Sequence, residues 1–506
     1  MAINLISTLI AFAINMGINF VLTPYIVTML GDEAYGFITL ANNFVNYASI
    51  VTLALNSVSG RFISIKIHQN KKEEANVYYN SVLISNIIMS SIFALISLIL
   101  IINLNKLIHI PNDMIFDVKL TFTLVFINFI LNMFSSIFNI ATFVKNRIDL
   151  SSSASILGYI IRLFLLIILF CFLKPRIFYI SIAAIVYTSI IIGFNYAFTK
   201  KLLKEIKFNL KVFSIKAIKE ITSLGIWNSI NNLSNILLTG LDLLIANVFI
   251  GPKAMGVLSI AKTIPSVITT FLGTVGGVYA PKFTILYAEG KKEELVNEVK
   301  LSIKVLGLLI TVPLAGFVIF GSEFYSLWLP SKTTMEINEI QLLSIITLGP
   351  VFVSAFVYSL YNINTVTNKL KVPVKVYFGI SIISTILVFI LLKLTKLGVY
   401  AIAGVSSTLL LLNVIFFVPS YAAYSLNIDK LTFYPPIIKG VTSFIIITIG
   451  FYLVKLNVQI NTWIDLIIVA FIVGVIGYIF NLFIALNKNE RKIMLSVIKN
   501  KIKKNN

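Results

Sequence analysis

Cysteine and histidine are almost absent from this chain. Cys171 is the only cysteine of the 506 residues, and His68 and His109 are the only histidines. A single thiol excludes an internal disulfide framework, and so few thiol and imidazole groups exclude a metal site built from them. They also leave no credible Ser/His/Asp or Cys/His arrangement for nucleophilic catalysis. The sequence has no Gly-x-x-x-x-Gly-Lys-Ser/Thr loop, so nothing in it supports direct drive by ATP. The sequence thus predicts a protein that is not an enzyme and uses no cofactor.

Charged residues are scarce, and long apolar runs take their place. Charged residues make up 12% of the chain, against about 25% in soluble proteins, and the mean hydropathy is +0.95. A membrane-spanning helix needs roughly 20 mostly apolar residues. Lipid cannot satisfy exposed backbone groups, and the short alternating segments of a barrel are missing, so we expect an all-α polytopic protein. About fourteen such runs lie near 3–29, 35–60, 78–103, 118–143, 153–173, 178–198, 224–250, 256–280, 300–321, 341–362, 374–394, 398–424, 436–456 and 464–486.

The remaining charges are mostly basic and lie mainly on one side of the predicted spans. The formal net charge is +21, and alternating the spans places 29 Lys and Arg in inner loops and 9 in outer loops. Cytoplasmic loops carry such an excess because Lys and Arg near span ends resist translocation. We therefore expect a multi-pass protein of the cytoplasmic membrane with both termini in the cytoplasm. A nucleic-acid partner is disfavoured because the basic residues are dispersed over many loops.

The C-terminal tail, residues 488–506, is basic and amphipathic. It can lie on the cytoplasmic membrane surface, where each Lys or Arg near anionic lipid gains about 1 kcal/mol. A frayed, solvated tail is the alternative.

An internal repeat appears when the chain is shifted by 220 residues. Without gaps, Gly31, Ala34, Gly36 and Ala41 fall on Gly251, Ala254, Gly256 and Ala261, and the run 71–74 (Lys-Lys-Glu-Glu) falls on 291–294. The repeat predicts two six-span lobes, 1–210 and 211–424, followed by two added spans within 425–487. Six is an even number, so the lobes are parallel in the membrane, related by an axis along its normal. Transporter substrate sites usually lie between such repeats.

Polar residues form a stripe in the first span of each predicted lobe. In the seventh span, Asn228, Asn231, Asn235 and Asp242 are spaced to share one helical face. In the first span, Asn15 maps onto Asn235 under the same offset, and Asn19 lies one turn further on. Such residues are costly in lipid, so they either bond neighbouring helices or face a water-filled cavity. The duplication of the stripe favours the cavity.

Short segments next to these spans resemble a known family. The run 30–36 (Leu-Gly-Asp-Glu-Ala-Tyr-Gly), its partial echo at 250–256 (Ile-Gly-Pro-Lys-Ala-Met-Gly) and the run 324–329 (Phe-Tyr-Ser-Leu-Trp-Leu) are similar to those of polysaccharide exporters. These are the O-antigen and teichoic-acid flippases of the multidrug/oligosaccharidyl-lipid/polysaccharide (MOP) superfamily. The resemblance covers essentially the whole chain. It implies a V-shaped pair of six-helix lobes that opens alternately to the two sides.

The resemblance also implies a polyprenyl-pyrophosphate-linked glycan as substrate, and the glycan polymerase and glycosyltransferases of one pathway as partners. The lipid II flippases of the same superfamily carry arginines in their first span, whereas this first span has no charged residue. A lipid II flippase and a cation-coupled multidrug extruder stay as alternatives. A membrane glycosyltransferase or polysaccharide polymerase is the enzymatic alternative, but the loops are short for a catalytic domain.

Four basic residues are candidates for binding the pyrophosphate. Arg61 ends the second span, Arg162 lies in the middle of the fifth, and Lys262 lies deep in the eighth, whereas Lys304 is close enough to the membrane surface to snorkel. Arg61 can equally be a positive-inside anchor. Lys262 and Asp242 lie at similar depths on adjacent helices, which predicts an ion pair, either static or opened by phosphate, a proton or sodium. The expected substrate residues are therefore Arg61, Arg162, Lys262, Asn15, Asn19, Asn228 and Asn235, with Asp242 in coupling.

Overall fold

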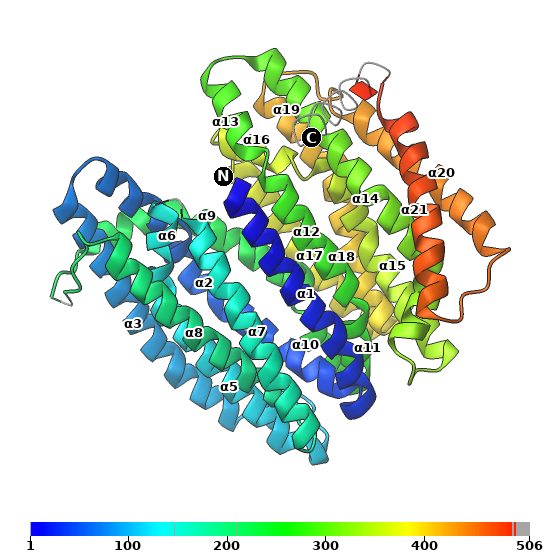
Figure 1. The fold of residues 1–506 in the computed structure, drawn as a ribbon, viewed down its shortest axis with the longest axis horizontal. Coiled ribbons are helices and arrows are strands. Elements are labelled where there is room, and N and C mark those ends of the chain that lie inside the picture. Colours follow the sequence, from blue (N-terminus) through cyan, green and yellow to red (C-terminus); the bar gives the residue numbers. More distant parts are fainter. Residues whose placement is uncertain (1, 146, 210, 488–489, 492–506) are drawn as a thin grey trace, which may run out of the picture. The chain divides into compact units, whose positions relative to one another are not determined.

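The computed structural model describes residues 2–145, 147–209, 211–487 and 490–491, and every regular element in these ranges is a helix (Figure 1). Most of the predicted tail, 488–506, lies outside the described residues. The helices up to residue 261 are α1 (Ala2–Leu30), α2 (Asp32–His68), α3 (Lys72–Ile102), α4 (Leu104–Leu107), η1 (Asn112–Met114), α5 (Ile115–Ser135), η2 (Ser136–Asn139), α6 (Ile140–Val144), α7 (Ile148–Phe172), α8 (Tyr179–Leu202), α9 (Ile215–Asn235), η3 (Ile236–Gly240), α10 (Asp242–Phe249) and α11 (Pro252–Ala261).

The later helices are α12 (Thr263–Gly277), α13 (Ala280–Ala288), α14 (Lys292–Trp328), α15 (Thr334–Val357), α16 (Leu360–Val366), α17 (Lys371–Leu394), α18 (Val399–Leu412), η4 (Asn413–Phe417), α19 (Val418–Ser425), α20 (Tyr434–Lys455) and α21 (Trp463–Ala485). Within the described ranges, 14 helical segments are long and apolar enough to cross a membrane. The prediction of an all-α polytopic fold with about fourteen spans is therefore confirmed.

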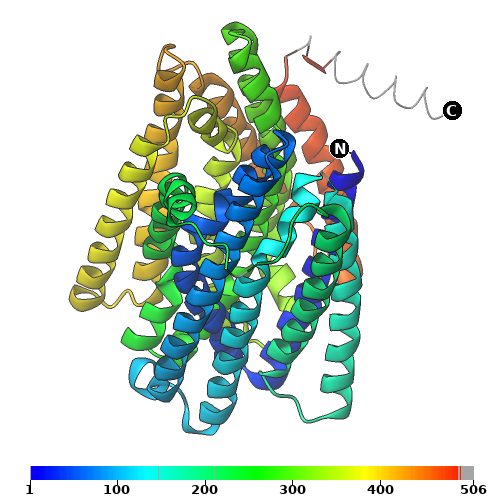
Figure 2. The same cartoon turned by 90° about the vertical axis from the view of Figure 1, so that its left-hand side faces the viewer.

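The helices pack into two compact units. Unit 1 consists of Met1–Ile260 and Ser381–Ile402, and unit 2 of Ala261–Ile380 and Ala403–Asn506. In unit 1, α3, α5 and α8 run side by side (Figures 1 and 2), and α1 packs on α7. In unit 2, α14 packs on α15, α20 and α21. These units follow packing rather than sequence repetition, so the lobes 1–210 and 211–424 remain a prediction.

The turn after the second span is repeated in detail at the predicted offset. The Lys71 N–H donates to Lys66 O (2.9 Å), and the Lys291 N–H donates to Leu286 O (3.0 Å). In each turn the residue before the lysine is left-handed, with φ 58° at Asn70 and 70° at Gly290. Such a residue allows a helix to end while its last carbonyls stay hydrogen-bonded. The sequence match thus reflects a repeated local structure.

The two halves differ in the helix that leads to this turn. In the first half α2 is continuous over 37 residues, whereas the second half divides the same stretch into α11, α12 and α13. The first break falls at Lys262, and the second follows Gly276 and Gly277. Adjacent glycines weaken a helix because they carry no side chain that restricts the backbone.

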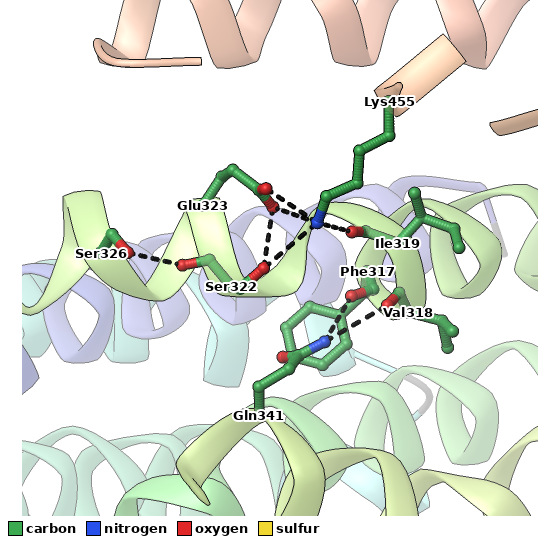
Figure 3. Close-up of polar contacts among 8 residues, drawn as sticks. All are labelled: Phe317, Val318, Ile319, Ser322, Glu323, Ser326, Gln341 and Lys455. Atoms are coloured by element: carbon green, nitrogen blue, oxygen red, sulfur yellow. Dashed lines mark hydrogen bonds and ion pairs between the residues drawn. The ribbon is translucent and has the colours of Figure 1, made fainter. Parts of the chain in front are cut away.

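The two added spans attach to α14 through polar contacts. At the end of α20, the Lys455 Nζ lies 2.7 Å from Ile319 O, 3.3 Å from Ser322 Oγ and 2.7 Å from Glu323 Oε1 (Figure 3). On the other side of α14, Gln341 of the neighbouring helix α15 donates to Phe317 O at 3.0 Å. A half-buried ammonium with three acceptors is well satisfied, so this cluster fixes α20 on α14.

Candidate functional site

The seventh span, Gly225–Phe249, is interrupted by one turn of π-helix, η3. There the Leu241 N–H donates to Ile236 O (2.9 Å), five residues back. The Gly240 carbonyl accepts from the Tyr47 hydroxyl of α2 (2.7 Å), and the Leu237 carbonyl accepts from the Thr385 hydroxyl (2.9 Å). Irregular backbone at membrane depth needs such side-chain partners, and π turns are frequent at functional sites.

The π turn separates Asp242 from the asparagine stripe. Asn228, Asn231 and Asn235 are exposed along α9, and Thr239 is exposed within η3, whereas Asp242 is only 3% exposed. The prediction of one shared face assumed 3.6 residues per turn throughout. The wider π turn changes that phase, so Asp242 is buried whereas the asparagines before it are exposed.

A second polar face, on α2, lies against this stripe. The Asn228 amide donates to Ser57 Oγ (3.1 Å), and the Asn232 amide donates to Ser49 Oγ (3.3 Å). The α2 face consists of Asn42, Asn46, Ser49, Ser57 and Arg61, all of which are exposed except the half-buried Ser49. Of these, only Arg61 was predicted from the sequence to be a site residue. The other four follow one another at intervals of three, four or eight residues, and this helical spacing could have predicted the face.

Arg162 lies in the middle of α7, roughly 21 Å from the start of the helix and 15 Å from its end. Its side chain is half-buried and its Nε is fully buried. Among the described residues, no hydrogen bond or ion pair reaches the guanidinium. One turn away, the Tyr159 ring stacks on Tyr187 of α8, with centroids 4.6 Å apart and planes 10° apart. Gly158 leaves the room for this stack, because a Cβ there would lie 2.8 Å from the Tyr187 ring.

Hydrogen bonds between α1 and α7 bring the asparagines of the first span to the depth of Arg162. Thr8 Oγ1 lies 3.2 Å from Ser152 Oγ, and the Tyr25 hydroxyl donates to Phe170 O at 3.4 Å. The two helices therefore run parallel with a nearly constant offset. Asn15, which is half-buried, falls near Tyr159, and the exposed Asn19 falls near Leu163. Unit 1 thus brings Arg162, two tyrosines and the α1 asparagines to one level of the membrane.

The two lysine candidates have different surroundings. Lys304 is 12% exposed and pairs with Glu490 at 2.5 Å, so its charge already has a protein partner. Burial alone would raise the pKa of Glu490, but hydrogen bonds from Lys304 and from the Asn487 N–H outweigh it and lower that pKa. Lys262 is half-buried at the break between α11 and α12. Because Asp242 belongs to unit 1 and Lys262 to unit 2, their ion pair stays a prediction.

Residues that are equivalent in the repeat touch each other where α2 meets α11. A Cβ on Gly36 would lie 3.0 Å from the Gly256 Cα, and the Ser259 hydroxyl donates to Thr39 Oγ1 at 2.9 Å. In both pairs the partners are 220 residues apart, the offset of the sequence repeat. Contact between equivalent residues is what a twofold axis produces, and small residues allow the two helices to approach closely.

Comparison with known proteins agrees with this architecture. A family model described as polysaccharide biosynthesis protein matches residues 1–287. The chain belongs to this family. It is also 30% identical over 501 residues to EpsK of Bacillus subtilis strain 168, an uncharacterized membrane protein, and the match covers 97% of each chain. The membership in the family that the sequence motifs suggested is therefore confirmed.

Solved structures show the same fold at low sequence identity. An inward-facing multidrug resistance transporter of the MATE family, in the MOP superfamily, has a TM-score of 0.68 at 14% identity, covering 82% of this chain and 94% of that one. The inward closed lipid II flippase MurJ has a TM-score of 0.64 at 13% identity, covering 96% and 98%. The chain is thus a multi-pass membrane protein of the polysaccharide biosynthesis family with the fold of these MOP proteins. The roles of the selected site residues, the termini in the cytoplasm and the cytoplasmic membrane as location remain predictions.

Proposed function

We propose that this protein is a flippase that moves a polyprenyl-pyrophosphate-linked oligosaccharide across the cytoplasmic membrane for polysaccharide export. The observation that carries the proposal is Arg162, an arginine at mid-membrane depth with no protein partner among the described residues. An arginine at the centre of a membrane helix costs about 2.5–3.5 kcal/mol on insertion scales. An anionic ligand that visits the site offsets this cost, and a pyrophosphate is such a ligand. Family membership supports a glycan as the group attached to it.

The polar faces nearby suit the sugar part of the substrate. The α2 face and the α9 stripe offer amides and hydroxyls, and Asn15 and Asn19 add amides at the level of Arg162. Tyr159 and Tyr187 offer a rigid stacked pair with hydroxyl groups. Translocation breaks no covalent bond, so hydrogen-bonding groups and one cation supply the chemistry that it requires.

The contact between α2 and α11 supports alternating access as the mechanism. Gly36 with Gly256 and Thr39 with Ser259 pair equivalent residues around a local twofold axis. Such a contact can separate while both helices stay intact, because small side chains meet there. In this proposal the separation opens the substrate path to one side of the membrane. The glycan polymerase and glycosyltransferases of the pathway are the proposed partners.

Deleting the gene and identifying the lipid-linked glycan that accumulates tests the proposal. Accumulation on the cytoplasmic leaflet, reversed by the wild-type chain, is the expected result. We expect Arg162→Gln to reach the membrane at the normal level and to leave the glycan accumulated. Arg176→Gln is the matched control, since Arg176 is exposed and pairs with the half-buried Asp117 (2.9 Å), and pairs near the surface contribute about 0–1 kcal/mol.

Three results would contradict the proposed function. If deleting the gene left the amounts of all lipid-linked glycans unchanged, the protein would not be their transporter. Lipid II as the only accumulating species would favour a lipid II flippase. Increased drug sensitivity with normal surface glycan would favour a multidrug extruder.

A further inference from the structure

An apolar cavity of about 330 Å³ lies between α2, α3 and α5 in unit 1. Its walls are aromatic, aliphatic and methionine side chains, and the only polar groups among the lining side chains are the hydroxyls of Tyr47 and Thr52. If each carbon group takes roughly the 30 Å³ of one liquid water, the cavity has room for about eleven carbon atoms. That is the size of two five-carbon isoprene units.

The cavity lies within the membrane-spanning part of α2. Its α2 wall, residues 44–52, begins twelve residues after Asp32, so it is roughly 18–30 Å from that end of the helix. Lipid tails are as apolar as the cavity walls, so apolar burial alone gives little affinity here. The affinity must therefore depend on how well the shape of the bound chain fits the cavity. Phe93 packs edge-on against Phe126 (5.7 Å) and Phe129 (4.9 Å), which makes one wall stiff.

Two flexible side chains, those of Met89 and Met133, also line the cavity. Methionine is unbranched and adapts to irregular shapes. Aromatic rings and adaptable methionines lie side by side on α3 and α5, and this lining suits a chain with methyl branches, which is bulkier than a straight acyl chain.

A cation lies at a suitable distance along the same helix. Arg61 is ten residues after Val51, a lining residue, and therefore roughly 15 Å from the cavity along α2. Arg61 is exposed and has no ion pair among the described residues. Cavity and cation together match an amphiphile with an anionic head and a branched tail.

We propose that the cavity holds the prenyl chain of the lipid-linked glycan while the pyrophosphate is first bound at Arg61, before it reaches Arg162, an inference that rests on the proposed function. The first few isoprene units then run along α2 and the next two fill the cavity. Tyr47 connects the cavity to the π turn of the seventh span, because its ring lines the cavity and its hydroxyl bonds that turn. A filled cavity therefore fixes the side chain through which α2 holds that turn.

Photolabelling of the purified full-length protein in lipid nanodiscs tests the proposal. The probe is a photoreactive polyprenyl pyrophosphate long enough to reach from Arg61 into the cavity, and labelled peptides are identified by mass spectrometry. We expect labels within 89–100 and 126–133. Ala48→Phe, which adds a ring to the cavity wall, should reduce labelling roughly tenfold, the factor that about 1.4 kcal/mol corresponds to. Ala470→Phe adds the same ring on the exposed side of α21 and is the matched control.

A second variant keeps the test decisive if Ala48→Phe fails to fold. Arg61→Gln changes an exposed residue, and it should weaken labelling by the pyrophosphate probe but not by the photoreactive polyprenol of the same chain length. Labels elsewhere, or labelling that neither variant changes, would overturn the proposal. So would competition by phosphatidylglycerol as strong as that by a long-chain polyprenyl pyrophosphate, because the cavity would then accept any acyl chain.

Labelling requires binding and not transport, so this inference and the proposed function can fail separately. Absent labelling while Arg162→Gln still blocks glycan export rejects the cavity assignment alone. Labelling as expected in a protein whose deletion leaves every lipid-linked glycan unchanged supports the cavity and rejects the flippase.

Discussion

A disulfide between positions 39 and 259 would show whether α2 and α11 must separate during transport. The Thr39 and Ser259 hydroxyl oxygens are 2.9 Å apart, and the C–S bond of cysteine is longer than the C–O bonds it replaces, so the sulfur atoms of Thr39→Cys and Ser259→Cys need only a small adjustment to reach the distance of about 2.05 Å in a disulfide. Rotation of the side chains can supply this. The native hydrogen bond contributes about 0.5–1.5 kcal/mol, which changes the population of a separated state by roughly tenfold at most. A covalent bond removes the separated state altogether.

The experiment requires Cys171→Ser, because the exposed native thiol would otherwise form competing links. A protease site inserted between α8 and α9 reports cross-linking, since the two fragments stay joined when the disulfide has formed. We expect export of the glycan to stop under an oxidant and to recover under a reductant. The variant with only Thr39→Cys should not respond. Fully cross-linked protein that exports normally would refute the reasoning, because the contact could then not be part of a gate.

Three further predictions concern other contacts. A Cβ on Gly225 would overlap an α2 carbonyl oxygen, so Gly225→Ala should destabilise the protein by about 1–3 kcal/mol, measured by thermal unfolding in detergent. The lowered pKa of Glu490 means that its bond to Lys304 stabilises the fold above the usual glutamate pKa. This stabilisation is lost as the pH falls through the lowered value, so Glu490→Gln should differ from wild type in melting temperature at neutral pH and not at strongly acidic pH. Lys262→Ala should abolish export, and adding Asp242→Ala should give a stable but inactive protein; a fully active double variant would contradict a substrate role for the lysine.

The membrane spans and the repeat were predictable because their physical causes are local. A helix in lipid must be apolar over its whole length, so the runs of apolar residues define the 14 spans directly. The turn at 69–71 recurs at 289–291 because each needs a left-handed residue followed by lysine, and Asn70 and Gly290 supply it. Neither inference depends on which helices are neighbours.

The details of the site depend on neighbouring helices, and sequence periodicity could not supply them. The π turn at 236–240 persists because Tyr47 and Thr385 from other helices satisfy its carbonyls, so the phase of Asp242 could not be read from its own span. Lys304 was a candidate for binding the substrate, but its ammonium group pairs with Glu490, which lies 186 residues away in the sequence. Conversely, the tyrosine stack beside Arg162 joins α7 to α8 and leaves no trace in the spacing of either helix.

The repeat explains the scaffold of this protein but not its chemistry. The turns and the contact between α2 and α11 obey the offset of 220 residues, whereas the cations of the candidate site do not: Asn42 corresponds to Lys262, and Arg61 to Pro281. A symmetric scaffold allows two helix bundles to separate and close in equivalent ways. A lipid-linked glycan has a charged end, a sugar end and a hydrocarbon tail, so its site requires different groups on each side. The asymmetry of the charges is therefore the feature that should follow the substrate, and exchanging Asn42 with Lys262 would move the cation while leaving the gate contact unchanged.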